Sequence, residues 1–151
     1  MSLSVMRVLI ESRSALDPEL AALVTAQQRE TGETAAFTPD DDSAYLVAAV
    51  DGRAVACAGW RAVGDGTAEL RRMYVRPSFR GRGIARQLVC WVEEEALAAG
   101  CPIVRLDTNP LLEAAIGLYL SSGYRPIPAY GEYAGNPDRV CFEKRLVALV
   151  Q

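Results

Sequence analysis

The sequence predicts a single α/β domain over residues 1–151, in which helices pack on a central sheet. Runs rich in β-branched and aromatic residues alternate along the chain with apolar runs at helical spacing. Two tight-turn signals, Asp51-Gly52 and Gly64-Asp65-Gly66, join three consecutive strands into an antiparallel meander. An Arg- and Gly-rich turn then leads the third of these strands into a helix.

The predicted order of elements is β-α-β-β-β-α-β-α-β-β. The first helix begins at Asp17-Pro18, because Asp caps a helix and Pro suits its first turn, and it ends at Gly32. Its apolar positions are Leu20, Leu23 and Val24. The strands are expected at residues 5–11, 44–50, 54–63, 67–75, 102–107, 124–128 and 139–146.

Two further helices are expected at residues 84–99 and 111–122, and they stop at Gly100 and Gly123. The first of the two has an apolar face at helical spacing, made of Ile84, Leu88, Trp91, Val92, Ala96 and Ala99. Residues 38–43 and 129–138 are expected to be loops.

Composition restricts the function classes. Half of the residues are hydrophobic, yet no run of about 18 apolar residues would span a membrane, and residues 1–7 lack the layout of a signal peptide. The chain contains no His, which excludes a His-based triad or a His-rich metal site, and its net charge of −3 argues against nucleic acid as a partner. A cytoplasmic protein with four reduced core cysteines is expected, these being Cys57, Cys90, Cys101 and Cys141.

The turn before the second helix is the first candidate site. A helix N-terminus offers unpaired N–H groups and the positive end of the helix dipole. Gly81 and Gly83 carry no Cβ, so an anion can approach the backbone closely. Six arginines lie between Arg71 and Arg86. The turn therefore predicts a phosphorylated ligand, and the alternative is a Gly-rich turn with solvated arginines.

Three phosphate-binding loops compete for this turn. A Walker loop needs Lys followed by Ser or Thr at the helix start, where this chain has Ala85 and Arg86. A dinucleotide fingerprint needs a third Gly, and that position is again Arg86. The turn instead resembles the acyl-CoA loop of the GNAT N-acetyltransferase superfamily, [Q/R]-x-x-G-x-[G/A], with Arg80, Gly83 and Ala85 in the motif positions.

A second motif carries the same resemblance. The string Ala115-x-x-Leu118-Tyr119-x-x-x-Gly123-Tyr124 is similar to the family's A-x-x-[LF]-Y-x-x-x-G-[FY]. The resemblance covers nearly the whole chain and implies the GNAT fold, a mixed and mostly antiparallel sheet of about seven strands, flanked by three or four helices and splayed between strands 4 and 5. It also implies acetyl transfer from acetyl-CoA, without a metal, directly to a primary amine of a small molecule or peptide. A homodimer is a further expectation, and a non-catalytic acyl-CoA sensor or another nucleotide-binding module is the alternative.

The resemblance assigns cofactor contacts to two stretches. The loop residues are Arg80, Gly81, Arg82, Gly83, Ile84, Ala85 and Arg86. Backbone N–H groups at a bulge in strand 67–75 would polarise the thioester, and they fall at Met73, Tyr74 and Val75. The family often has an Asn seven residues before the motif Tyr, where this chain has Leu112. Asn109 is a candidate replacement, although Asn before Pro is also a common turn pair.

Two residues are candidates for proton transfer. The amine must lose a proton before it attacks, and Glu69, 11 positions ahead of Arg80, matches the family's glutamate base. The alternative is that Glu69 is an ordinary exposed charge on its strand and that water chains carry the proton. Tyr119 matches the family's general acid for the leaving thiolate, and the alternative is a core tyrosine.

The identity of the acceptor is left open. In the family its pocket is walled by segments that correspond to residues 31–43 and 129–138. Their acidic and aromatic residues would suit a cationic amine, and they are Glu33, Asp40, Asp41, Asp42, Glu132, Asp138, Tyr130 and Tyr133.

Overall fold

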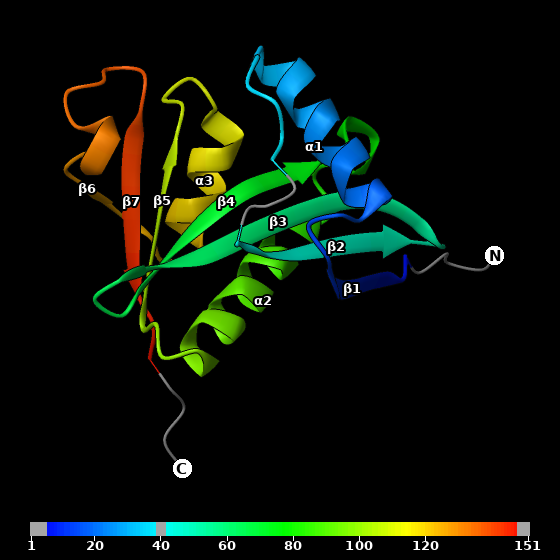
Figure 1. Ribbon diagram of the computed structural model, residues 1–151, viewed down its shortest axis with the longest axis horizontal. Helices are drawn as coiled ribbons and strands as arrows, with labels where there is room; N and C mark the ends of the chain where they lie inside the picture. Colours follow the sequence, from blue (N-terminus) through cyan, green and yellow to red (C-terminus); the bar gives the residue numbers. More distant parts are fainter. Residues whose placement is uncertain (1–5, 39–41, 148–151) are drawn as a thin grey trace. The chain divides into compact units, whose positions relative to one another are not determined.

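The computed structural model describes residues 6–38 and 42–147, and the predicted mixed α/β fold is confirmed (Figure 1). The described strands form one sheet in the order β1-β2-β3-β4-β5-β7-β6. They are β1 Val8–Arg13, β2 Ala44–Val50, β3 Arg53–Gly64, β4 Thr67–Val75, β5 Ile103–Thr108, β6 Arg125–Ile127 and β7 Val140–Arg145. The helices are α1 Pro18–Thr31, α2 Ile84–Ala98 and α3 Glu113–Ser121, with short 3₁₀ turns at Pro77–Phe79 and Gly131–Tyr133.

The chain divides into two compact units, each of which is described by itself. The first comprises Met1–Arg61 and Arg71–Cys90, and the second comprises Ala62–Leu70 and Trp91–Gln151. The strands β3 and β4 and the helix α2 contribute residues to both units. That residues 1–151 fold as one domain stays a prediction.

The first unit is built around α1, whose ends follow the local rules. The Asp17 carboxylate accepts a hydrogen bond from the Leu20 N–H (2.9 Å), and Gly32 closes the helix in the left-handed conformation. The predicted apolar face of α1 is buried in a core that also takes side chains from β2, β3 and β4. The buried members of this core are Leu20, Leu23, Val24, Tyr45, Val47, Ala54, Cys57 and Tyr74.

The predicted hairpin between β2 and β3 is also confirmed. Asp51 and Gly52 both have positive φ, at 51° and 79°, as the hairpin turn that matches the strand twist requires. The strands pair antiparallel from Val50↔Arg53 to Ala44↔Trp60, with a register shift near Ala48.

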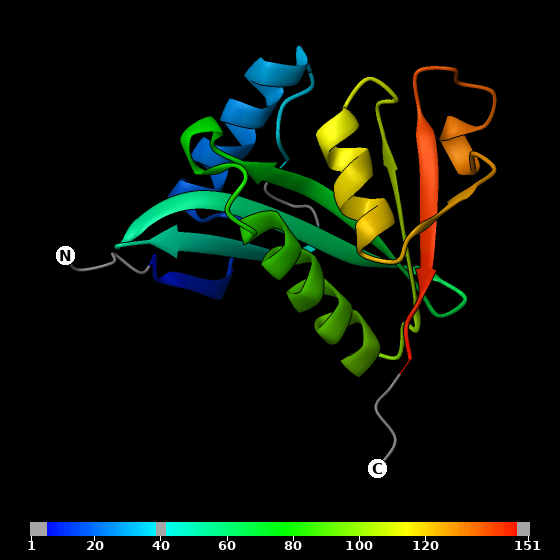
Figure 2. The same ribbon diagram turned by 180° about the vertical axis from the view of Figure 1, so that it is seen from behind.

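The second unit contains β5, β6 and β7, joined by antiparallel ladders (Figure 2). Along β5 the side chains alternate, with Val104, Leu106 and Thr108 buried and Arg105 and Asp107 more exposed. On the parallel side, the ladder between β4 and β5 runs only from Thr67↔Ile103 to Glu69↔Arg105, and both strands continue beyond it. This is the predicted splayed pair.

Several details of the prediction are wrong. The first strand was expected at residues 5–11, of which residue 5 lies outside the described residues. Its ladder with β2 runs from Val8 to Arg13, so residues 6 and 7 are not part of it and it ends two residues later than expected. Trp91 is 42% exposed and Cys90 is exposed, although both were expected in the core. The buried row of α2 recurs every four residues from Ile84, so the helical period places Trp91 at its margin and Cys90 on the opposite side. No helix in the described part of the chain is long and apolar enough to cross a membrane.

Candidate active site

The loop between β4 and α2 exposes its backbone. Gly81 and Gly83 have φ of 76° and 81°, a region that side chains with a Cβ rarely adopt. A Cβ placed on either residue would meet no atom within 4 Å, so the space beside both glycines is open. The helix begins at Ile84, which is 1% exposed and fixes the loop to the core. Its neighbours Arg82 and Arg86 are exposed.

Arg80 holds this loop in place through contacts with β4 and α1. Its Nε donates to the Val75 carbonyl (2.8 Å), and its Nη2 lies 2.8 Å from both carboxylate oxygens of Glu30 on α1. The hydrogen bonds to Glu30 raise the pKa of Arg80. The guanidinium also lies over the Tyr74 ring, 5.6 Å from its centroid. The motif arginine therefore ties together the end of β4, the loop and α1.

The strand β4 is irregular where a bulge was predicted. Arg72 has φ of 53°, and three consecutive residues, Arg71 to Met73, are only partly buried between the buried ends of the strand. Two carbonyls here are held by side chains: Gln27 Nε2 donates to Met73 O (2.9 Å), and Cys57 Sγ donates to Arg72 O (3.3 Å).

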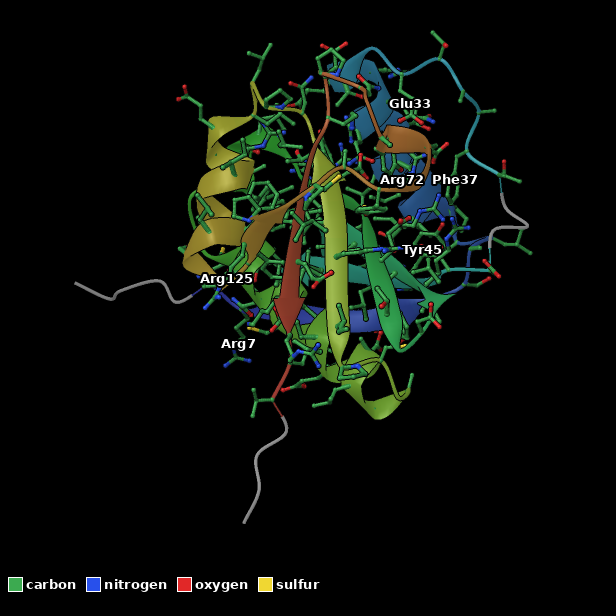
Figure 3. The ribbon with its side chains drawn as sticks, turned by 90° about the vertical axis from the view of Figure 1, so that its left-hand side faces the viewer. Arg7, Glu33, Phe37, Tyr45, Arg72 and Arg125 are labelled. Atoms are coloured by element: carbon green, nitrogen blue, oxygen red, sulfur yellow. The ribbon has the colours of Figure 1, made fainter. Side chains whose placement is uncertain are left out.

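The Cys57 thiol and the Arg72 guanidinium both help to hold this irregular segment. Burial raises the pKa of Cys57 to about 12, so the thiol keeps the proton that it donates. The Arg72 guanidinium forms a two-pronged ion pair with Glu33, at 2.7 and 3.1 Å (Figure 3). Among the predicted contacts, Tyr74 and Val75 are buried and Met73 is partly buried.

In the second unit, Glu69 lies at the last paired position of the splayed strands. Its side chain is buried, and the Tyr130 hydroxyl donates a long hydrogen bond (3.5 Å) to its Oε2. Its register partner on β5 is Arg105. Glu69 is therefore not the exposed strand charge that was the alternative interpretation, although its role as a base stays a prediction.

Tyr119 lies on α3 and is 5% exposed. Its ring packs edge-on against that of Tyr124, with centroids 5.9 Å apart. Burial, and then the charge of Asp107, raise the pKa of Tyr119 above its ordinary value, so the phenol keeps its proton. Within the described residues the Tyr119 hydroxyl has no hydrogen-bond partner, whereas buried tyrosines usually find one. This hydroxyl is thus able to donate to a ligand.

Beside Glu69, two tyrosines of the loop before β7 pack on cations. The guanidinium of Arg105 lies 4.0 Å from the Tyr130 ring centroid, and that of Arg139 lies 6.0 Å from the Tyr133 centroid. Arg139 also forms an ion pair with Asp107, and its Nε donates to the same carboxylate (2.6 Å). Burial is the main cause that raises the pKa of both tyrosines.

The acidic wall expected around the acceptor is only partly described. Glu33 is engaged by Arg72, while Asp40 and Asp41 lie outside the described residues. The exposed acids are Asp42, Glu132 and Asp138. The two tyrosines expected in this wall each contact a guanidinium group of the protein itself, so one face of each ring is already used.

Comparison with known proteins decides the family. The sequence profile of the Acetyltransferase (GNAT) family matches residues 10–124. The chain belongs to this family. It is also 36% identical over 107 residues to an IAA acetyltransferase of Azospirillum brasilense. This alignment covers 70% of this chain and 69% of that one. The predicted family is thus confirmed, and the chain is an acetyltransferase.

Solved GNAT structures share the fold. A Klebsiella pneumoniae protein assigned as an acyl-CoA N-acyltransferase superposes with a TM-score of 0.82 at 29% identity, covering 93% of this chain and 98% of that one. The PaiA N-acetyltransferase of Thermoplasma acidophilum, solved in complex with coenzyme A, gives a TM-score of 0.73 at 17% identity, covering 93% and 99%.

The chain departs from the GNAT motif at Leu112. Leu112 precedes α3 and is 46% exposed. Asn109 Oδ1 accepts a hydrogen bond from the Leu111 N–H (2.8 Å), which is the side-chain turn that Asn before Pro favours. The oxygen of Asn109 is therefore used locally, and its contact with the cofactor stays a prediction.

Sequence reasoning missed three residues, namely Gln27 in the first unit and Arg105 and Arg139 in the second. A signal existed for one of them, because the alternation of charged and apolar residues along β5 places Arg105 and Asp107 on the face opposite to Val104 and Leu106. For Gln27 the sequence carries no signal, since its partner Met73 lies 46 residues away.

Proposed function

We propose that this GNAT protein transfers the acetyl group of acetyl-CoA directly to a primary amine. The observation that carries the proposal is the loop at Gly81 and Gly83, where open space beside a positive-φ backbone precedes the N-terminus of α2. Backbone N–H groups at such a turn suit a pyrophosphate, and the exposed Arg82 and Arg86 add positive charge. Relatives with the same fold bind coenzyme A.

Four parts of the chain would share the work. The loop at residues 80–86 holds the CoA phosphates, and backbone N–H groups at Met73, Tyr74 and Val75 stabilise the negative charge that develops on the thioester oxygen. Glu69 accepts a proton from the amine, directly or through water, so that the nitrogen lone pair can attack. Tyr119 donates a proton to the leaving thiolate. No protein group is acetylated on the way.

Release of free thiol from acetyl-CoA tests the proposal. Purified protein is incubated with acetyl-CoA and a panel of amino acids, polyamines, aminoglycosides and peptides with free N-termini. A rate above that without acceptor supports transfer to an amine. Acetyl-CoA binding with no thiol release on any amine would instead favour the non-catalytic sensor.

A substitution in the loop tests its role in binding. Gly83→Asp places a carboxylate where the pyrophosphate is expected, so acetyl-CoA affinity should fall more than about tenfold, or about 1.4 kcal/mol. Gly83→Asn is the matched control, because Asn is nearly the same size, is uncharged and tolerates positive φ better than most residues. Calorimetric titration with acetyl-CoA measures both. Equal affinities for the Asp variant and the unmodified protein would rule out the loop as the phosphate site.

Two wider features of the function are also proposed. The chain would work in the cytoplasm, and the four free cysteines are in keeping with a reducing compartment. It would form a homodimer, as symmetric pairs are the commonest oligomers of soluble proteins. Light scattering at micromolar concentration should give about twice the chain mass of 16.3 kDa, and a monomer mass would contradict the dimer.

A further inference from the structure

Arg105 is a cation that forms no ion pair with the described residues of the chain. Among residues 6–38 and 42–147, no side chain or carbonyl accepts a hydrogen bond from its guanidinium or forms an ion pair with it. Its Nε is fully buried and also lacks a partner. An incompletely solvated charge without a partner is unfavourable, and an anionic ligand would relieve this.

The neighbouring carboxylates do not pair with Arg105 in the described structure. Asp107, two residues along β5, is paired with Arg139. Glu69 and Glu143 are the register partners of Arg105 on β4 and β7, yet neither forms an ion pair with it in the described structure. Arg105 is therefore flanked by carboxylates without being neutralised by them.

The Tyr130 ring fixes the position of the guanidinium. The guanidinium carbon lies 4.0 Å from the ring centroid, a short cation–π contact. A guanidinium held against a ring loses little further freedom when it binds, and its fork of N–H donors matches the two oxygens of a carboxylate. Tyr130 also donates to Glu69, so one side chain contacts both the candidate base and the unpaired cation.

We propose that Arg105 binds a carboxylate of the acceptor, which makes the acceptor an amine of the amino-acid type. This rests on the proposed function, because it places the acceptor's amine at Glu69. Glu69 and Arg105 are register partners on neighbouring strands, which lie about 4.8 Å apart, so an acidic and a basic side chain leave the backbone side by side, in keeping with the two ends of a zwitterion. The amine of the acceptor binds near the Glu69 carboxylate, and the carboxylate of the acceptor binds the Arg105 guanidinium.

Paired probes test this proposal by binding and by turnover. Melting temperatures are measured with L-amino acids and with the corresponding amino-acid amides, which keep the amine and lose the acid. Thiol release from acetyl-CoA is followed on the same pairs. Arg105→Gln removes the charge, Arg105→Lys keeps it without the fork, and Arg125→Gln on β6 is the control at an exposed arginine.

The expected result is a preference for the acid that depends on Arg105. For at least one pair, the acid should stabilise the unmodified protein more than its amide does, and kcat/KM for the acid should be about tenfold or more higher. Arg105→Gln should abolish this preference with little effect on the amide, Arg105→Lys should keep part of it, and Arg125→Gln should keep it all.

Failure of this inference and failure of the proposed function give different results. Amides bound or acetylated as well as the acids, or a preference that survives Arg105→Gln, would overturn the role of Arg105 alone. Absence of thiol release on any amine would overturn the proposed function. In that case the melting temperatures still test the role of Arg105. Amino acids that raise the melting temperature of the unmodified protein but not that of Arg105→Gln support an anion site at Arg105. Equal increases in both proteins reject it.

Discussion

Replacing Glu69 by Gln is expected to lower kcat/KM by about 10²-fold, since a positioned general base typically contributes that much or more. Gln keeps the shape of the side chain and a partner for the Tyr130 hydroxyl, but it cannot accept the amine proton. The acid limb of the pH profile of kcat/KM, which reports protonation of the base, should flatten in the variant. Thiol release over a range of pH measures both effects.

Glu94→Gln is the matched control for this substitution. Glu94 lies on α2 in the same unit as Glu69, but its side chain is exposed. Its replacement removes the same charge from the surface and should leave the rate and the pH profile unchanged. A Glu69→Gln variant with full activity at neutral pH and an unaltered profile would show that Glu69 is structural and that another route carries the proton.

The parts of the fold that the sequence predicts well are those decided by neighbours in the chain. Asp17 caps α1 with its own carboxylate, three residues from the N–H that it binds. Asp51 and Gly52 set the β2–β3 turn with two positive φ angles. In each case the chemistry of a few consecutive residues is sufficient, because no distant segment is needed to satisfy the backbone.

The irregularity in β4 shows where local reasoning ends. The broken alternation of residues 70–73 predicts a change of register, but not that Arg72, a residue with a Cβ, takes positive φ. That conformation is unfavourable for Arg, and distant side chains hold it. Cys57 binds the Arg72 carbonyl from 15 residues away, and Glu33 binds its guanidinium from 39 residues away.

In the candidate site, too, the sequence predicts what neighbouring residues determine and not what distant residues determine. The two motifs placed the loop and Tyr119, because each is a continuous string. The charge balance around Glu69 depends instead on which carboxylate meets which guanidinium across β4, β5 and β7. The sequence shows the charges of Arg105, Asp107 and Arg139, but only the structure pairs Asp107 with Arg139 and places Arg105 over the Tyr130 ring.

Replacing Tyr119 by Phe is expected to lower kcat by about 10²-fold or more, with acetyl-CoA affinity and melting temperature nearly unchanged. The change removes only the hydroxyl, which has no hydrogen-bond partner in the described structure, so little folding energy is lost. Because burial raises the Tyr119 pKa above 10, the acid form persists at neutral and moderately alkaline pH. Its contribution to the rate should therefore be constant below pH about 10 and fall only above it.

Tyr124→Phe is the control that separates catalysis from packing. Tyr124 is as buried as Tyr119 and its ring packs against it, but its hydroxyl donates to Glu93 (2.9 Å), which Lys144 also contacts. Loss of this hydrogen bond to a charged group should lower the free energy of unfolding by about 1.5–3 kcal/mol while kcat stays near that of the unmodified protein. If Tyr119→Phe instead behaves like Tyr124→Phe, with altered stability and kcat intact, Tyr119 is a core residue and the leaving thiolate takes its proton from another donor.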